Sequence, residues 1–264
     1  MSNRMLILIF ALAIIANPVW YANTVKAGVV VTDGLVSFWT FDKSDIDNKT
    51  VKDVWGNNDG TIVGNPKRVE GKIEEALEFN GKSDFIDCGN DESLNLTDAI
   101  TIEVWIKPKS AGEGGPNAGP VCKAEAGVNP WSWQLRYNAP GSFMGFQFNA
   151  NPGGSTWISV QERLSPGKWY HIAGTFNGKE IICYLNGVEK QRGKIAAISG
   201  GAGKFFIGQD GWVNVFNGVI DEVRIYNRGL NENEIKQNYE STSQLAVASA
   251  DKLAITWGKI KIED

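Results

Sequence analysis

The sequence predicts an all-β fold, a two-sheet antiparallel β-sandwich with one short C-terminal helix. Three observations indicate this class. Short apolar or alternating segments recur along the chain, clusters of Gly, Asn, Asp and Pro separate them, and only one segment has a helical pattern. Within 101–106, alternation places Ile102, Val104 and Ile106 on one face, as expected of a strand with two unlike faces.

The expected strands lie between turn-forming residues from Gly28 to Asn227. In chain order they are 35–41, 60–64, 76–80, 84–89, 100–108, 132–138, 143–149, 156–161, 169–177, 180–187, 204–209 and 218–228. Asn-Gly pairs at 80–81, 177–178 and 186–187 predict tight hairpin turns, because both residue types tolerate positive φ.

The helix is expected over 231–239, at the end of the sandwich. Asn231 is the predicted N-cap, and Glu234, three residues later, completes a capping box. Residues 241–264 then read as a linker followed by one extra strand. That strand would pair either with a partner or with an edge of the same sandwich.

The amino terminus has the pattern of a secretory signal. A charged start precedes an apolar run over 5–16, which is too short to cross a membrane as a helix, and Val25-Lys26-Ala27 fits a cleavage site. We interpret 1–27 as a signal peptide, with a retained membrane anchor as the alternative, and 28–240 as the domain. The protein is then expected to be secreted, periplasmic or at the cell surface, with no membrane span after signal removal.

Composition excludes several function classes. The 264-residue chain has a formal net charge of −4, so it offers no basic field for nucleic acid. A single histidine, His171, makes zinc sites and Ser/His/Asp catalysis difficult to assemble, and its position within an apolar strand predicts a structural role. Ten tryptophans require either a core to fill or an apolar surface for a ligand.

The three cysteines leave two interpretations open. Each lies in an apolar, strand-like segment, and they are Cys88, Cys122 and Cys183. They are either buried small hydrophobic residues or one disulfide plus a single thiol.

Four stretches together resemble the laminin G-like (type 3) jelly-roll family of the concanavalin A-like lectin/glucanase fold. They are GLVSFWTFD with VWGNNDGTIVG, GKIEEALEFNGKSDFIDCG, LTDAITIEVWIKP, and PGKWYHIAGTFNGKEIICYLNGV with the FFIGQD and FNGVIDEVRIYNRGLNENEI segments after it. The resemblance covers about 28–240. It implies two stacked sheets of six or seven strands each, usually in a carbohydrate- or protein-binding module, with Trp39, Trp55, Trp105 and Trp169 in the core.

The catalytic motif of glucanases with this fold does not occur in the sequence. Such enzymes have carboxylates alternating along one strand, in the pattern Glu-x-Asp-x-x-Glu, so that two can act as nucleophile and acid. The nearest segment offers adjacent Asp221 and Glu222, which alternation would point to opposite faces. We therefore expect no catalytic residues.

Asp42 and Asp221 are candidate ligands of a structural calcium ion. If the first and last strands pair, these carboxylates approach each other, and calcium prefers such oxygen ligands. The resemblance adds that several proteins of this fold bind a structural calcium ion in such a place, and Asn80 and Ser83 of the intervening turn are candidates for further ligands. Alternatively, the two aspartates cap turns or accept hydrogen bonds from backbone amides.

Loop aromatics predict a sugar-binding surface. Trp131, Trp212, Asn214 and Asn151 are the candidate ligand-binding residues, because indole rings stack on pyranose faces and amides bond hydroxyls. Trp133 and Trp157, next to strand residues, are expected on the sandwich rim instead.

The sequence is compatible with three functions. The first is a non-catalytic exported module that binds a glycan or glycoconjugate and carries calcium. The second is a protein-interaction or adhesion module of the same fold, in which these loops meet a protein surface. The third is a glycoside hydrolase with an atypical site.

Overall fold

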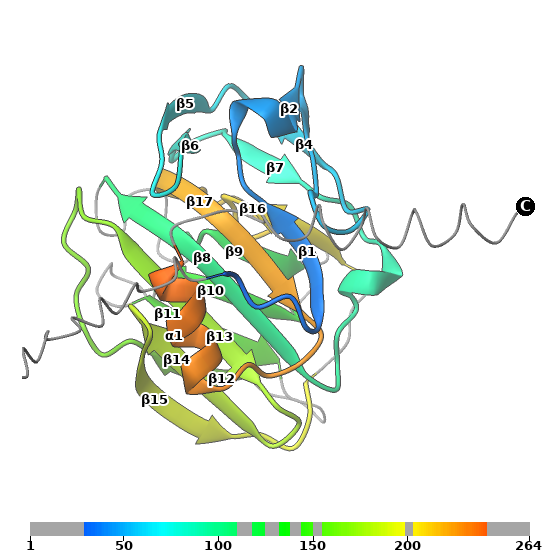
Figure 1. Cartoon of the computed structure of the whole chain (residues 1–264), viewed down its shortest axis with the longest axis vertical. Helices are drawn as coiled ribbons and strands as arrows, with labels where there is room; N and C mark the ends of the chain where they lie inside the picture. Colours follow the sequence, from blue (N-terminus) through cyan, green and yellow to red (C-terminus); the bar gives the residue numbers. More distant parts are fainter. Residues whose placement is uncertain are drawn as a thin grey trace, which may run out of the picture.

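The computed structural model describes residues 29–109, 118–124, 132–137, 144–149, 155–198 and 203–241. These residues form two antiparallel β-sheets packed face to face, with one helix on the outer side of one sheet (Figure 1). The predicted all-β sandwich is confirmed. The predicted signal segment and all of the predicted tail after Ser241 lie outside the described residues, so these boundaries stay predictions. Within the described ranges, no helix combines the length and apolarity needed to cross a membrane.

The first sheet has eight strands in the order β15-β14-β13-β8-β17-β6-β5, and β1 also pairs with β17. Its strands are β1 (Leu35–Trp39), β5 (Lys67–Glu70), β6 (Glu75–Asn80), β8 (Ile100–Pro108), β13 (Tyr170–Phe176), β14 (Glu180–Leu185), β15 (Val188–Lys194) and β17 (Asn217–Tyr226). The central strands β8 and β17 are buried along nearly their whole length.

The second sheet has nine strands in the order β12-β11-β10-β9-β16-β7-β4-β3-β2. Its strands are β2 (Ile46–Asp47), β3 (Thr50–Val51), β4 (Gly60–Val63), β7 (Phe85–Asp87), β9 (Val121–Ala124), β10 (Trp133–Tyr137), β11 (Met144–Asn149), β12 (Ser155–Ser159) and β16 (Lys204–Ile207). Two 3₁₀ turns, Lys43–Asp45 and Glu92–Leu94, complete the elements before β8. The sheets thus exceed the six or seven strands that the resemblance implied.

Large rings fill the space between the sheets. Trp39 and Trp133 are completely buried, and their ring centroids lie 5.3 and 5.4 Å from that of Phe205. The cysteines are buried thiols without disulfides, which confirms the first of their two interpretations: Cys88, Cys122 and Cys183.

The expected core tryptophans divide into three groups. Trp39 fills the interior as predicted. Trp105 is also buried, but on the outer side of its sheet, where its ring stacks on Tyr239 of the helix. Trp55 and Trp169 are only half-buried, which corrects their assignment to the core. Loop residues near strand ends cover a ring from one side only, and sequence patterns do not distinguish this from full burial.

The helix α1 (Glu232–Glu240) lies across the outer side of the eight-stranded sheet (Figure 1). The predicted capping box is present, because the Asn231 side chain accepts from the Glu234 N–H at 3.1 Å and the Glu234 carboxylate accepts from the Asn231 N–H at 2.9 Å. Ile235 is completely buried against an apolar cluster on the sheet.

A buried polar network attaches α1 to the sheet through Glu103. Its Oε1 accepts from Asn238 Nδ2 at 2.8 Å and from Arg224 Nη1 at 3.2 Å. His171, completely buried as its structural role predicts, places Nε2 3.5 Å from Glu103 Oε2. Burial alone would raise the pKa of Glu103, but the hydrogen bond and charge of His171, together with the charge of Arg224, hold the pKa below its usual value.

Candidate functional site

Polar side chains line the outer side of the nine-stranded sheet, where β10 and β11 pair. Gln134 and Gln147 lie directly opposite each other, and Gln134 Nε2 donates to Gln147 Oε1 at 2.9 Å. Arg136 Nε donates to the same oxygen at 2.7 Å. Alternation explains this placement, since Trp133 and Leu135 point into the core between these polar residues.

Trp157 of β12 completes this surface, which we call the polar face: Gln134, Gln147, Arg136 and Trp157. The Arg136 guanidinium lies 5.1 Å from the centre of the indole ring, within cation–π distance. Gly145 makes room for the ring, because a Cβ at this position would lie 2.5 Å from Trp157 Cζ2. The indole therefore lies over the sheet, and it is half-buried.

Gln134 carries the most informative atom of the polar face. Its side chain is 1 % exposed, and its Oε1 has no hydrogen-bond partner in the part of the chain that the structure describes. Buried amide oxygens without partners are uncommon and costly. A donor that comes within hydrogen-bond distance of this oxygen would therefore be stabilising.

The loop between β16 and β17 borders the polar face. It folds back over β9, where Cys122 Sγ donates to the Asp210 carbonyl at 3.3 Å, and Cys122 is the strand neighbour of Gln134. The Asp210 carboxylate holds the loop closed by accepting from the N–H groups of Trp212 at 2.9 Å and Asn214 at 3.1 Å. The Trp212 side chain remains 48 % exposed.

The structure describes two of the four predicted ligand-binding residues. Trp212 and Asn214 share one loop beside the polar face, whereas Trp131 and Asn151 lie outside the described residues. Sequence reasoning missed Gln134 and Gln147. The available signal was the alternation of polar residues along 132–136, which marks a polar outer face on a strand.

The four predicted calcium ligands divide into two separate pairs, Asp42 with Asp221 and Asn80 with Ser83. Asp42 Oδ1 accepts from the Glu75 N–H at 3.0 Å, at the start of β6. Asn80 ends the same strand, five residues later, and its Oδ1 accepts from the Ser83 N–H at 2.9 Å within a turn. A strand rises about 3.3 Å per residue, so the two pairs are separated by about 16 Å. They do not form one site.

Asp221 and Asp42 do lie close enough to interact. Asp221 Oδ2 accepts from the N–H groups of Lys72 at 2.8 Å and Ile73 at 3.1 Å, whereas its Oδ1 is buried with no partner among the described residues. Burial first, and then the charge of Glu222, raise the pKa of Asp221 to about 8; Asp42 adds to the shift.

The expectation that Asp221 and Glu222 point to opposite faces of the sheet is wrong. A β-bulge between Asp221 and Arg224 interrupts the pairing of β17 with β8, and Glu222 adopts a φ of +53°. Its carboxylate consequently forms an ion pair with Arg224 on the outer side of the sheet, the side on which Asp221 lies. Both carboxylates are completely buried there.

These contacts give a limited fit to calcium. Asp221 Oδ1 is an available oxygen, but Asp221 Oδ2 and Asp42 Oδ1 already accept backbone hydrogen bonds, and calcium takes 6–8 oxygen ligands. Within the described ranges, no group of three or more His, Cys, Asp or Glu side chains is arranged to hold a metal ion. A calcium ion here would bind Asp221 and Asp42 and draw its other ligands from backbone carbonyls and water.

The fold and the polar face define an antiparallel jelly-roll sandwich with a polar outer surface, a class that includes lectins. Solved structures support this class. Domain 4 of AbnA, an extracellular arabinanase from Geobacillus stearothermophilus solved with arabinotriose, superposes with a TM-score of 0.63 at 23% identity, covering 78% of this chain and 98% of that one.

The chain belongs to the concanavalin A-like lectin/glucanases superfamily. The laminin G type 3 family model matches residues 80–236, more than half of the chain, and confirms the resemblance seen in the sequence. No curated protein sequence matches the chain.

Two further structures show how widely the fold is used. The binding domain of botulinum neurotoxin DC, solved with rat synaptotagmin II, has a TM-score of 0.62 at 15% identity, over 80% of this chain and 52% of that one. Trypanosoma rangeli sialidase has a TM-score of 0.59 at 20% identity, over 80% of this chain and 33% of the sialidase. The fold therefore occurs in binding domains and in about one third of a sialidase chain.

Proposed function

We propose that the protein is a non-catalytic, exported module that binds carbohydrate or glycoconjugate, and that its site is the polar face together with Trp212 and Asn214. The observation that carries this proposal is the unpartnered, buried Gln134 Oε1 on a face bordered by the loop that exposes Trp212. Amide and guanidinium groups bond sugar hydroxyls, and an indole ring stacks on the C–H face of a pyranose.

The carboxylates of the described residues support a non-catalytic role. Retaining glycosidases need two carboxyl groups about 5 Å apart, and inverting enzymes about 6.5–9.5 Å, on either side of the bond to be cleaved. Asp210, which borders the polar face, is engaged in hydrogen bonds within its own loop. Asp221 and Glu222 are completely buried on the other sheet, where no substrate reaches them.

A protein-binding role is the second candidate, favoured by one observation. Val213, next to Trp212, is 82 % exposed, so the loop tip presents adjacent apolar side chains. The botulinum neurotoxin domain solved with synaptotagmin is a protein-binding example of the fold. The amide and guanidinium groups of the polar face favour the carbohydrate role, because sugar hydroxyls both donate to and accept from such groups.

Polysaccharide pull-downs and glycan arrays test the proposal with three proteins. Wild-type protein should be retained on at least one glycan, and Trp212→Ala and Gln134→Met should each lose about tenfold or more in affinity, because each removes one ligand contact worth 1–3 kcal/mol. Val188→Ala is the matched control, since Val188 is an exposed apolar residue on β15 of the other sheet. Equal retention of all variants on every glycan contradicts the proposed face.

A further inference from the structure

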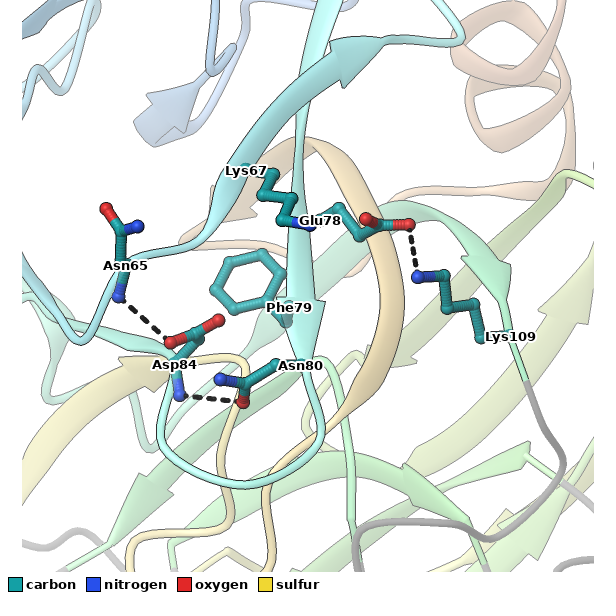
Figure 2. Close-up of a pocket in the computed structure, with 7 residues that line it drawn as sticks. All are labelled: Asn65, Lys67, Glu78, Phe79, Asn80, Asp84 and Lys109. Atoms are coloured by element: carbon teal, nitrogen blue, oxygen red, sulfur yellow. Dashed lines mark hydrogen bonds and ion pairs between the residues drawn. The ribbon is translucent and has the colours of Figure 1, made fainter.

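A pocket lies away from the polar face, between the β5–β6 hairpin and the turn that leads into β7 (Figure 2). Its volume is about 150 Å³, smaller than the usual site for a drug-sized ligand, so it can take only a small group such as one sugar residue. It is lined by Asn65, Lys67, Glu78, Phe79, Asn80, Asp84 and Lys109.

Asp84 is the buried polar group of this pocket, at 3 % exposure. Its Oδ1 accepts from the Asn65 N–H at 2.9 Å and lies 3.5 Å from Ser83 Oγ. A Cβ at Gly64 would lie 2.4 Å from this oxygen, so the glycine, at a φ of +80°, lets the chain close around the carboxylate. The backbone therefore fixes the orientation of Asp84.

The other carboxylate oxygen of Asp84, Oδ2, has no hydrogen bond and no cation within 4.0 Å among the described residues. Figure 2 shows it turned away from Asn65, toward the side chains of Phe79 and Lys67. Asp84 lines the pocket, so solvent or a ligand can donate to this oxygen. The pocket is the route by which a ligand would supply that donor.

Lysines supply donors on the opposite wall. Lys109 Nζ pairs with Glu78 Oε1 at 2.8 Å, which fixes both side chains. Lys67, the strand neighbour of Glu78, has neither an ion pair nor a hydrogen bond within the described residues. The pocket thus presents an unused acceptor on Asp84 and an unused donor on Lys67.

A ligand that satisfies both groups must donate and accept within a short distance. Hydroxyl groups do both, and neighbouring sugar hydroxyls present the two functions side by side. The two lysines and the two carboxylates of the lining balance in charge, which favours a neutral ligand.

We propose that this pocket is a second saccharide-binding subsite, which takes one neutral sugar residue. Asp84 Oδ2 accepts from one hydroxyl, Lys67 Nζ donates to its neighbour, and the edge of Phe79 contacts the ring carbons. The subsite shares no residue with the polar face and does not depend on it. Two weak subsites on one module raise the affinity for a polymer through effective concentration.

NMR titration with glucose, galactose and arabinose tests the subsite, because backbone amide shifts report weak binding residue by residue. At least one sugar should shift the backbone amide resonances of Gly64, Asn65 and Asp84 in the wild-type protein. Asp84→Asn keeps an acceptor for the Asn65 N–H but replaces the open oxygen by a donor. It should weaken binding about tenfold or more, as should Lys67→Met, which changes an exposed side chain.

Two controls separate the outcomes. Lys82→Met changes an exposed lysine of the same turn that does not line the pocket, and should leave the titration unchanged. Trp212→Ala should weaken polysaccharide retention without altering these shifts, so failure of one site is distinguishable from failure of the other. No shift with any of the three sugars, shifts that persist in both pocket variants, or stronger shifts with inorganic phosphate would overturn the subsite.

Discussion

Asp221 places a carboxyl group where its charged form is unstable. Its pKa is raised to about 8 in the folded protein, first by burial and then by Glu222, whereas a carboxyl in the unfolded chain titrates near pH 4. Between these values the folded state holds a proton that the unfolded state has released. Stability therefore falls as pH rises from about 4 to about 8, and then levels off.

Asp221→Asn should remove this slope, because the amide carries no charge yet retains an acceptor for the Lys72 and Ile73 amides. We expect the variant to be more stable than wild type by a few kcal/mol at pH 8, since each pKa unit corresponds to about 1.4 kcal/mol. Urea unfolding at pH 5 and pH 8 measures the difference. Parallel pH profiles for the two proteins would contradict this role of Asp221.

The calcium ion predicted from the sequence would compensate the same charge if it binds Asp221 and Asp42. Millimolar calcium should raise the melting temperature of the wild-type protein, more at pH 8 than at pH 5, because at low pH a proton occupies the carboxyl group. Asp221→Ala should lose the effect, and Asp47→Ala, which removes an exposed carboxylate, should keep it. Absence of any shift at millimolar calcium would refute calcium binding by Asp42 and Asp221.

The residues of the proposed binding site were only partly predictable from the sequence. Exposure of Trp212 follows from its Gly-rich, polar loop, which forms no regular strand. The relation of that loop to Gln134 does not follow, because it depends on the Asp210 carbonyl contacting Cys122, 88 positions away in the chain. Local patterns report local structure, and long-range pairing requires the fold.

At the scale of elements, strands with an apolar face were predictable and polar edge strands were not. The prediction of 100–108 coincides with β8. β15 was missed because its sequence, VEKQRGK, lacks an apolar face, and β5 was missed for the same reason. Both lie at edges of the first sheet, where charged side chains discourage pairing with other chains.

The capping box of α1 contributes directly to stability. Asn231→Ala removes the acceptor for the Glu234 N–H and should lower the free energy of unfolding by about 1 kcal/mol. Urea denaturation followed by circular dichroism measures this loss. Glu240→Ala, at the other end of the helix, removes only an exposed ion pair with Lys236 and should change stability by less than about 0.5 kcal/mol. Equal effects of the two substitutions would argue against the cap.

At the scale of the whole molecule, Asn238 connects three parts of the chain. Its side chain accepts from the Val31 N–H at 2.8 Å and donates to Glu103 on β8 and to Tyr226 on β17. Asn238→Ala leaves buried groups unsatisfied and should cost about 1–3 kcal/mol. Hydrogen exchange should accelerate over 29–35 and over α1 before it does so in the central strands. Uniform acceleration across the sandwich would contradict this order.

The contact between Val31 and Asn238 also joins the first and last segments of the described domain. Because these two positions meet on the eight-stranded sheet, tension applied through both ends of the domain would first separate the N-terminal segment from α1. The polar face lies on the other sheet and would carry none of that initial load. A pull on both ends of the described domain would thus load the contact between Val31 and Asn238 before it loads the polar face.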